Sequence, residues 1–567
     1  MKIKSNIAQI INEALLKSDI TIEGDIVINE ATKPQFGDYQ YNGIMPLAKI
    51  YKTNPREIAN RVVQNIQTGE LIERVEVAGA GFINIWLSDQ ALSIEASEYL
   101  NDVHLGVSKA LESQKIVVDY SGPNMAKEMH VGHLRSSIIG DALAKLFEFL
   151  GHKVIRQNHI GDWGTQFGML IAYLEEIGVE QSDELKSLEA FYKNAKKRFD
   201  EDANFATKAR EYVVKIQQGD AHCLKLWQNF IDISLSHCED VYEKLGVSLS
   251  KEDVKAESFY NDALPKVIEA LEAKELLQVS EGAKCVFKEG EEIPLIVQKG
   301  DGGYLYATTD LAAINYRTHE LEANRIVYVV DARQAGHFKA VFDVAKRAGF
   351  AKEDTQLEHV AFGTMMDKSG KPFKTRDGGT VKLIELLDEA VARAQDTIKE
   401  RESYSDEQLN AVAKVVGIGA VKYADLSINR ESNYIFDWDK MLSFDGNTSL
   451  YLQYAYARIQ SILKKYDGSI EHCQIAIGDE IEHKLVLMIL KLEDMLMRAA
   501  SENTPHTISS YLYDLSTLFM KFYEQNPILK EDLELKLKES RIAIAWLTAQ
   551  TIKLGLDILG IKVLNRL

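Results

Sequence analysis

Two histidines separated by a valine and a glycine, in the tetrapeptide HVGH at residues 130–133, offer the first recognisable chemistry in this sequence. An apolar run at residues 115–121, typical of a buried parallel strand, precedes them, and a helix with apolar residues at helical spacing follows. His130 and His133 are therefore expected at a helix N-terminus on the carboxyl edge of a sheet, where α/β folds bind ligands and phosphate is attracted. Gly132 would let a ring or sugar approach the backbone. Two ordinary surface histidines are the alternative.

The second candidate is the cationic segment MMDKSGKPFKTR at residues 365–376, which follows an expected strand. Lys371, Lys374 and Arg376 are three of its four cations, in a chain of net charge −19. Cations here suit pyrophosphate, because negative charge develops on the leaving oxygen during phosphoryl transfer. A solvated lysine-rich loop is the alternative for this segment alone. Because the histidine motif belongs to the other half of the same sheet, the pair favours a catalytic role.

The stretch from residue 118 to 170, which includes SGPNMAKEMHVGHLRSSIIGD and NHIGDWGTQFGML, resembles the class I arginyl-tRNA synthetases. ATKPQFGDYQ near the start and QYAYARIQ in the last third extend the resemblance almost end to end. It implies ligation of L-arginine to its cognate tRNA(Arg) through arginyl-adenylate, with ATP supplied as its Mg²⁺ complex and no protein-bound metal. The HVGH tetrapeptide is similar to the family's HIGH signature. The cationic segment replaces the family's KMSKS loop, and only Lys371 and Lys374 match it strictly.

An arginine substrate needs acceptors in its pocket, because the guanidinium group carries five donors and keeps its charge. Tyr306 and Asp310 offer a ring and a carboxylate four residues apart, on one face of a helix. The residues alone leave open whether Thr309 or Asp310 merely caps a helix beginning at residue 311. The resemblance implies that Tyr306 and Asp310 hold the substrate, and Glu257 is a second possible guanidinium partner.

The resemblance also assigns further residues around the two substrates. It implies that Gln334 binds arginine and that Asn124 and His133 contact the backbone end of the amino acid. Lys127 is a candidate catalytic helper, because the family often has a lysine just before its histidine motif. The expected ATP site comprises His130, Gly132, His133 and Lys374. The expected catalytic set comprises Lys127, His130, His133, Lys371, Lys374 and Arg376.

The tyrosine-rich segment QYAYARIQ lies in an expected helical region, to which the resemblance assigns reading of the anticodon. Aromatic rings and guanidinium groups stack on unpaired bases, although tyrosines at helical spacing also fit a core seam. The resemblance further implies that the N-terminal domain meets the tRNA elbow. The residues expected to contact tRNA are Phe36, Tyr39, Gln40, Tyr451, Tyr454 and Arg458.

The chain has 567 residues, which is too long for one core and suggests three domains. The resemblance implies an α/β class I synthetase fold, with a Rossmann-type parallel sheet, an N-terminal α/β domain and a C-terminal all-helical domain. The expected domains are 1–90, which contacts tRNA; 115–380, the catalytic domain with a helical insertion at about 175–245; and 381–567, which includes an anticodon-binding domain at about 445–567. We also expect a helical connector at 92–113 and strands at 325–331 and 357–364.

Charge and cysteine content limit the function further. A net charge of −19 argues against a surface that binds nucleic acid everywhere, so RNA binding must use local patches. Four widely spaced cysteines and the lack of a long apolar segment predict a cytoplasmic protein that does not enter a membrane, and we expect a monomer. One alternative is a related nucleotidyl transferase that activates another small acid. The other is an RNA-binding protein without catalysis, which would be expected to lack His130, His133 or the lysines.

Overall fold

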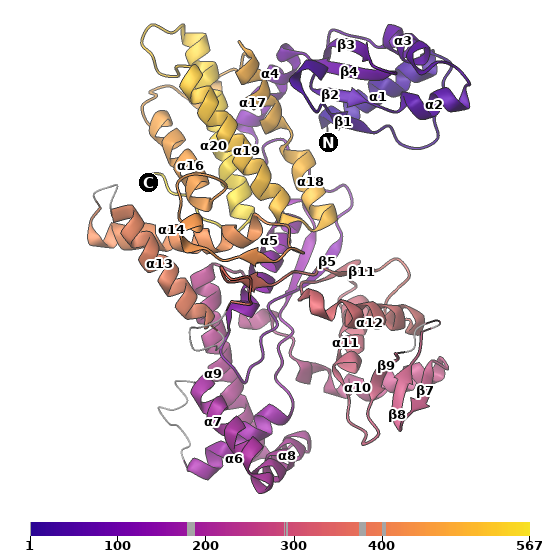
Figure 1. Cartoon of the computed structure of the whole chain (residues 1–567), viewed down its shortest axis with the longest axis vertical. Helices are drawn as coiled ribbons and strands as arrows, with labels where there is room; N and C mark the ends of the chain where they lie inside the picture. Colours follow the sequence, from indigo (N-terminus) through magenta and orange to yellow (C-terminus); the bar gives the residue numbers. More distant parts are fainter. Residues whose placement is uncertain (1, 179–187, 289, 291–292, 374–380, 400–403) are drawn as a thin grey trace.

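A four-stranded parallel sheet forms the centre of the molecule, with the other parts of the chain arranged around it (Figure 1). The computed structural model describes residues 2–178, 188–288, 290, 293–373, 381–399 and 404–567. The strand order is β11-β10-β5-β6, with the bounds Gln356–His359, Arg325–Tyr328, Lys115–Asp119 and Lys153–Gln157. The register pairs Asp119 with Gln157 on one side and with Tyr328 on the other. The last residues of three strands therefore meet at one edge.

Helix α5 (Leu134–Phe149) lies between β5 and β6 in the chain and forms the crossover that two adjacent parallel strands require. It is buried on almost every side, which explains why its sequence is apolar well beyond one stripe. Helices α11 (Tyr306–Asn315) and α12 (Ala335–Ala348) flank β10, and a π-helical turn, Tyr316–Glu320, continues α11. These elements surround the carboxyl edge of the sheet.

Two smaller bodies are inserted between β6 and β10 (Figure 1). The first is helical and comprises α6 (Thr165–Ile177), α7 (Leu188–Glu201), α8 (Ala203–Gln217) and α9 (Ala221–Leu245). The second comprises the 3₁₀ turn Glu257–Ala263, α10 (Leu264–Ala273) and an antiparallel sheet of β7 (Leu277–Ser280), β8 (Ala283–Val286) and β9 (Leu295–Gln298). The charged helical pattern of the sequence predicts the first body, whereas the second has no corresponding prediction.

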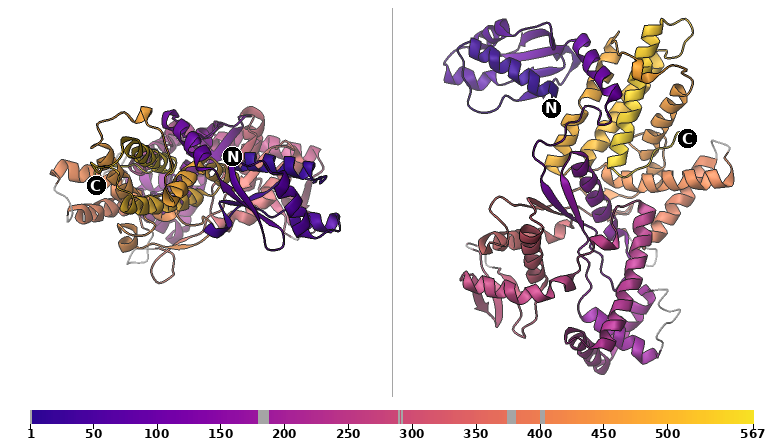
Figure 2. Two further views of the ribbon diagram at one scale, coloured as in Figure 1. Left: turned by 90° about the horizontal axis from the view of Figure 1, so that it is seen from above. Right: turned by 180° about the vertical axis from the view of Figure 1, so that it is seen from behind.

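The N-terminal domain is an antiparallel sheet with helices. Its strand order is β1-β2-β4-β3, with the bounds Ile28–Glu30, Tyr39–Tyr41, Phe82–Leu87 and Ile72–Ala78. Its helices are α1 (Lys2–Lys17), α2 (Ile44–Ile50) and α3 (Pro55–Asn65). In α3 the Asn54 side chain accepts the backbone N–H of Arg56 and Pro55 opens the helix, which are residue types favoured at these two positions. Figure 2 shows this domain at the opposite end of the molecule from helices α6 to α8.

The C-terminal part is almost entirely helical. Its helices are α13 (Leu383–Lys399), α14 (Asp406–Leu426), α15 (Trp438–Met441), α16 (Ser449–Leu463), α17 (Glu480–Leu490), α18 (Leu492–Glu502), α19 (Pro505–Gln525) and α20 (Leu535–Ile558). One short strand, β13 (Tyr434–Ile435), pairs in parallel with β12 (Met365–Met366) and joins this part to the segment that follows β11. None of the described helices is long and apolar enough to cross a membrane.

Several expected boundaries differ from the structure. The connector expected at 92–113 is helical only through α4 (Asp89–Glu98) and the 3₁₀ turn Tyr99–Asn101. The strands expected at 325–331 and 357–364 end at Tyr328 and His359, where the chain leaves the sheet to form the site. The helical insertion begins at Thr165 instead of near residue 175. The fold class is confirmed: an α/β parallel sheet, an N-terminal α/β domain and a C-terminal helical domain.

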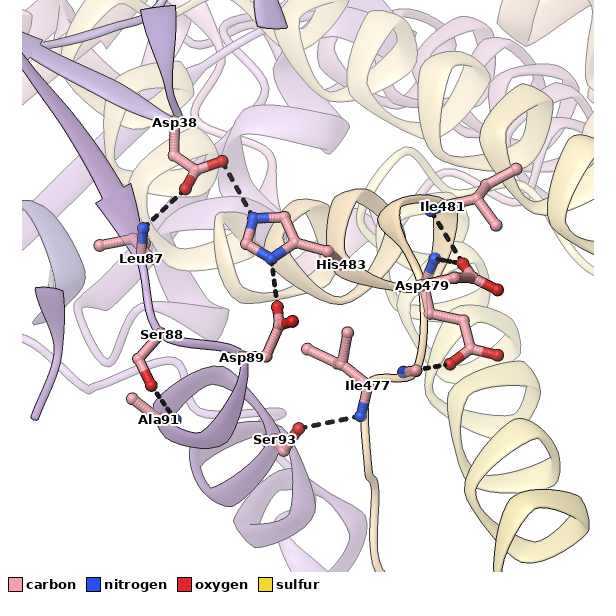
Figure 3. Close-up of polar contacts among 12 residues, drawn as sticks. Asp38, Leu87, Ser88, Asp89, Ala91, Ser93, Ile477, Asp479, Ile481 and His483 are labelled. Carbon is pink, nitrogen blue, oxygen red and sulfur yellow. Dashed lines mark hydrogen bonds and ion pairs between the residues drawn. The ribbon is translucent and has the colours of Figure 1, made fainter. Parts of the chain in front are cut away.

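A histidine from the helical domain joins it to the N-terminal domain (Figure 3). His483, on α17, bonds through Nε2 to Asp38 Oδ1 at 3.0 Å and through Nδ1 to Asp89 Oδ1 at 2.5 Å. Carboxylates offer only acceptors, so both ring nitrogens must donate and the ring is cationic. Burial lowers the pKa of His483, but hydrogen bonds to Asp38 and Asp89 outweigh it and raise the pKa to about 9. Lys491 reinforces this junction by an ion pair with Glu30 at 2.9 Å.

Replacing His483 with glutamine should destabilise the protein near pH 6.5 by about 1–3 kcal/mol, since hydrogen bonds to charged groups are lost. The folded-state pKa lies above the unfolded value of about 6.5. The stabilisation is therefore complete below about pH 6.5 and lost as the pH rises through about 9. Urea unfolding at pH 6.5 and 9.5 should show this decline in the parent protein, while His483→Gln loses that component. His472→Gln, at an exposed histidine, is the control. If the free energy of unfolding changed equally with pH in all three proteins, protonated His483 would not stabilise the junction.

Candidate active site

A cavity of about 890 Å³ opens at the carboxyl edge of the parallel sheet. Its walls include the ends of β5 and β10, the start of α5, and residues from α11 and α12. The residues predicted to bind ATP or arginine that line this cavity are His130, Gly132, His133, Glu257, Tyr306, Asp310 and Gln334. The fold thus brings the HVGH motif and the predicted arginine-binding residues together around one cavity.

The chain turns sharply where β5 ends. Ser121, which lines the cavity, has φ of 73°, a left-handed conformation that is costly for a residue with a Cβ atom. Its backbone N–H donates to Ser136 Oγ at 2.8 Å, and that hydroxyl donates to the carbonyl oxygen of Val329 at 2.7 Å. These bonds hold the strained turn in place, which is how such conformations persist at functional sites.

The two imidazoles of the HVGH motif lie side by side at the start of α5. Their ring centroids are 4.0 Å apart. Nδ1 of His130 accepts the N–H of Gly132 at 3.0 Å, and Nδ1 of His133 accepts the N–H of His130 at 3.1 Å. In a neutral imidazole whose Nδ1 accepts, the proton is on Nε2. Both rings therefore keep an Nε2–H donor for a ligand.

Both imidazoles are held in the neutral form. Burial, with the neighbouring His130 as a smaller cause, lowers the pKa of His133 to about 3. Burial and the nearby Lys127 ammonium lower the pKa of His130. Neutral rings at a helix N-terminus donate hydrogen bonds to phosphate oxygens and do not exchange protons near neutral pH.

Tyr306 and Asp310 lie on α11 and line another part of the cavity. The helix begins at Tyr306 and its N-cap is Leu305, so Asp310 lies inside the helix. The alternative that Asp310 merely caps a helix is therefore wrong. Its carboxylate is 17% exposed, and its Oδ2 lies 2.6 Å from Nε2 of His337 on α12.

Glu257 adds a second carboxylate to this part of the cavity. It opens a 3₁₀ turn, and no hydrogen bond or ion pair of its carboxylate is found among the described residues. Burial, followed by the negative charges of Asp162 and Asp310, raises the pKa of Glu257 to about 8. A cation placed between these carboxylates would relieve their repulsion.

A fully buried arginine underlies the same pocket. Arg317, in the π-helical turn after α11, pairs through Nη2 with Asp119 Oδ2 at 2.7 Å. Its Nε donates to Gln157 Oε1 at 2.6 Å, and its guanidinium lies 5.0 Å from the centre of the Tyr328 ring. Asp119, Gln157 and Tyr328 are the last residues of β5, β6 and β10. This side chain therefore fixes α11 against three strand ends.

Several predicted residues stand outside this cavity. Its described lining does not include Asn124, Lys127 or Lys371. The Asn124 side chain accepts the N–H of Ala126 at 3.0 Å, the Lys127 ammonium lies 4.7 Å from the centre of the Tyr192 ring, and Lys371 is exposed. Lys374 and Arg376 lie outside the described residues. These positions remain predictions from the sequence.

The residues predicted to contact tRNA in the N-terminal domain fall into two groups. The Tyr39 side chain is fully buried, with the ammonium groups of Lys4 and Lys491 near its ring, so it cannot contact an RNA. The expectation for Tyr39 is therefore corrected. Phe36 and Gln40 are half-buried, and Gln40 donates to the Asn84 side chain at 2.6 Å.

Tyr451, Tyr454 and Arg458 lie on α16 and are half-buried. Arg458 donates to the Tyr454 hydroxyl at 3.1 Å and lies 4.7 Å from the centre of the Tyr523 ring. Tyr451 packs against Tyr513 with the ring centroids 5.6 Å apart. The cluster is thus a packed aromatic face that is still partly open to solvent.

The sequence analysis missed three residues of the cavity and its base: Asp119, Arg317 and His337. Asp119 carried a usable signal, since an acidic residue ends a buried strand of the predicted sheet. His337 follows Gln334 by three residues, a spacing that places both on one side of a helix. No pattern in the sequence connects Arg317 to Asp119.

A parallel sheet with an HVGH motif at its carboxyl edge, an appended helical domain and a carboxylate-lined pocket define a class I aminoacyl-tRNA synthetase. Three family models match the chain: "tRNA synthetases class I (R), catalytic domain" over residues 96–438, "DALR anticodon binding domain" over 452–567 and "Arginyl tRNA synthetase N terminal domain" over 1–87. The chain belongs to the arginyl-tRNA synthetase family.

Similar proteins span the whole chain. The arginine–tRNA ligase of Chromobacterium violaceum is 51% identical over 571 residues, 99% of each chain, and that of Hahella chejuensis is 50% identical over 100% of each. The structure of arginyl-tRNA synthetase from Plasmodium falciparum matches with a TM-score of 0.88 at 32% identity, covering 100% of this chain and 99% of that one. The Thermus thermophilus enzyme shares the fold, with a TM-score of 0.84 at 23% identity over 100% of each chain.

Replacing His133 with alanine should slow amino-acid-dependent ATP–pyrophosphate exchange by on the order of a hundredfold, since one donor to the transition state is lost. The thermal unfolding temperature should stay close to that of the parent protein, since the substitution is expected to affect the reaction much more than the fold. Because burial holds the pKa of His133 at about 3, the parent activity should show no ionisation of this group between pH 5 and 8. His472→Ala, which removes an exposed imidazole, should leave exchange unchanged. Normal exchange by folded His133→Ala would remove the motif from the mechanism.

Proposed function

We propose that this protein activates L-arginine with ATP in the large cavity and then transfers the arginyl group to tRNA(Arg). The observation that carries the proposal is that one cavity is lined by two chemically different groups of residues. Two neutral imidazoles and a helix N-terminus form one group, and two carboxyl groups with an aromatic ring form the other. We assign the two groups to opposite ends of the bound substrates, the imidazole end and the carboxylate end. Family membership sets aside the two alternatives raised by the sequence, another small acid as substrate and an inactive RNA-binding protein.

The carboxylate end suits the guanidinium group of arginine. Asp310 and Glu257 supply acceptors from two different elements, and Tyr306 supplies a ring face for the cation. Gln334 would contact the amino acid farther along the cavity, and Asn124 with His133 would meet its backbone end. A bound guanidinium would lower the pKa of Glu257, because its positive charge offsets the negative charges of Asp162 and Asp310. A cationic side chain would therefore favour the carboxylate form of Glu257.

The imidazole end suits the phosphates of ATP. His130, Gly132 and His133 would donate hydrogen bonds to phosphate oxygens while a carboxylate oxygen of arginine attacks the α-phosphorus. Pyrophosphate leaves, and arginyl-adenylate remains bound. Lys371, Lys374, Arg376 and Lys127 are the cations proposed to stabilise the leaving charge, and Mg²⁺ enters with ATP as part of the substrate. Positioning and electrostatics suffice, so no covalent enzyme intermediate is required.

The second step moves the arginyl group to the terminal ribose of tRNA(Arg). We assign contacts with tRNA to the N-terminal domain, residues 1–90, and to the helical region at 445–567. The residues proposed for these contacts are Phe36, Gln40, Tyr451, Tyr454 and Arg458. Their support is partial exposure next to aromatic surface, which suits stacking on unpaired bases. We further propose that the protein is cytoplasmic, which four buried cysteines without disulfide bonds support. We also propose that it is a monomer, for which light scattering should give the 63.8 kDa mass of one chain.

Replacing Asp310 with asparagine should lower kcat/KM for arginine strongly, because a desolvated guanidinium loses its charged partner. The decrease should correspond to a loss of about 3–5 kcal/mol in transition-state stabilisation. Asparagine keeps the shape but turns donors toward the guanidinium donors. The measurement is the ratio of activation efficiencies for arginine and citrulline, which is neutral and nearly isosteric. Both proteins should reject citrulline. Asp301→Asn, in an exposed turn, is the matched control. Near-normal arginine efficiency in Asp310→Asn would place the guanidinium elsewhere.

Replacing Arg458 with glutamine should raise KM for tRNA(Arg) several-fold and leave KM for arginine unchanged, because α16 does not border the cavity. Loss of one stacking contact with a base typically weakens binding of a single strand by about 1–3 kcal/mol. Filter binding of tRNA and steady-state aminoacylation give the two constants. Lys464→Gln, a cation at the end of the same helix, is the comparison. If tRNA affinity is retained in Arg458→Gln, α16 packs the domain and does not bind RNA.

A further inference from the structure

We propose that His337 is a positioning residue for the amino-acid substrate, whose imidazole holds the Asp310 carboxylate in the orientation that receives the guanidinium group. This inference rests on the proposed arginine site at Asp310. It adds a residue that touches neither the guanidinium nor the reacting atoms and that acts through its hydrogen bond to the carboxylate.

The contact joins two neighbouring helices in the wall of the cavity. Nε2 of His337, on α12, lies 2.6 Å from Oδ2 of Asp310, on α11, and both side chains line the cavity. The two side chains are only 28% and 17% exposed. A carboxylate has no donor, so the imidazole donates its Nε2–H to Asp310. The bond occupies Oδ2 of Asp310. Because this bond limits rotation of the carboxylate, it also fixes the direction in which Oδ1 points.

The imidazole is itself held by packing. Its ring meets Phe338 edge-on, with centroids 5.4 Å apart, and Phe338 stacks on His359 at 4.9 Å. His359 in turn bonds through Nε2 to the carbonyl oxygen of Val330 at 3.0 Å. The orientation of Asp310 is therefore connected, through three rings, to the end of the sheet. A free aspartate would instead rotate about its terminal torsion, which is broad and roughly two-fold.

Orientation matters for guanidinium in particular. Guanidinium is a planar fork that binds carboxylate best when the two groups share a plane, whereas an ammonium ion is a point charge. A carboxylate fixed by one hydrogen bond is ready for the fork, so less rotational freedom is lost on binding. Removing the imidazole should therefore weaken arginine binding without altering the reaction of bound arginine.

The experiment compares His337→Gln with His337→Leu in the full-length protein. Glutamine carries an amide N–H about as far from the backbone as Nε2 of histidine, while leucine fills similar space without a donor. In aminoacylation with saturating ATP and tRNA(Arg), His337→Leu should raise KM for L-arginine about tenfold or more, with kcat within about twofold. His337→Gln should stay within about threefold of the parent KM. Calorimetric titration of L-arginine should show the same order of affinities.

Two further variants separate positioning from packing. His337→Asn is polar but too short to reach Asp310, so it should behave like the leucine variant and provides the test if that variant does not fold. His359→Leu removes the last ring of the same stack but leaves the His337–Asp310 bond in place, so it should raise KM less than His337→Leu does. Thermal unfolding of each variant confirms that the compared proteins are folded.

The proposal is overturned if folded His337→Leu or His337→Asn keeps the parent KM, if either binds arginine more tightly, or if His337→Gln fails as badly as they do. Tighter binding would mean that the imidazole competes with the guanidinium for Asp310. Asp310→Asn distinguishes this failure from failure of the arginine site. If Asp310→Asn loses arginine use while His337→Leu does not, only the role of His337 is wrong. If Asp310→Asn is normal, the site itself is wrong.

Discussion

The buried ion pair between Arg317 and Asp119 is the interaction on which the rest of the site depends. It fixes the end of α11 to the end of β5, with Gln157 and Tyr328 holding the same guanidinium from the neighbouring strands. Removing one member of such a pair costs about 3–5 kcal/mol, because the other charge is left buried and unpaired. Since α11 carries Tyr306 and Asp310, the strand ends also set where the proposed arginine ligands lie.

The fold also keeps the hydrogen-bond donors at the start of α5 apart from the acidic residues that line the cavity. The strained turn after β5 leads to the helix N-terminus, where the paired imidazoles accept backbone N–H groups through Nδ1 and stay neutral. In the part of the wall that holds Glu257 and Asp310, burial and the neighbouring negative charges raise the pKa of Glu257 to about 8, and Arg317 is already engaged by Asp119. One end therefore offers donors to an anion, and the other offers acceptors to a cation. A substrate with a carboxylate and a distant cationic group, together with ATP, fits this arrangement.

Much of this arrangement follows from the sequence, and the limits have physical causes. The apolar run before HVGH predicted β5, and helical spacing predicted that Tyr306 and Asp310 share one helix, because both patterns are local. The pairing of Arg317 with Asp119 and of His337 with Asp310 depends on how distant elements pack, which periodicity does not encode. Tyr39 was misjudged for the same reason: its burial results from contacts with α1 and with Lys491 of a remote domain. The small sheet β7 to β9 was missed because its strands are only four residues each.

The central claim is that one cavity orients arginine between the carboxylates of α11 and the imidazoles at the start of α5. A crystal structure with L-arginine and a non-hydrolysable ATP analogue tests it most directly. The account predicts the guanidinium within about 2.7–3.2 Å of the Asp310 carboxylate, and phosphate oxygens at similar distances from Nε2 of His130 or His133. A guanidinium bound near the imidazoles, or phosphates bound near Asp310 and Glu257, would contradict it.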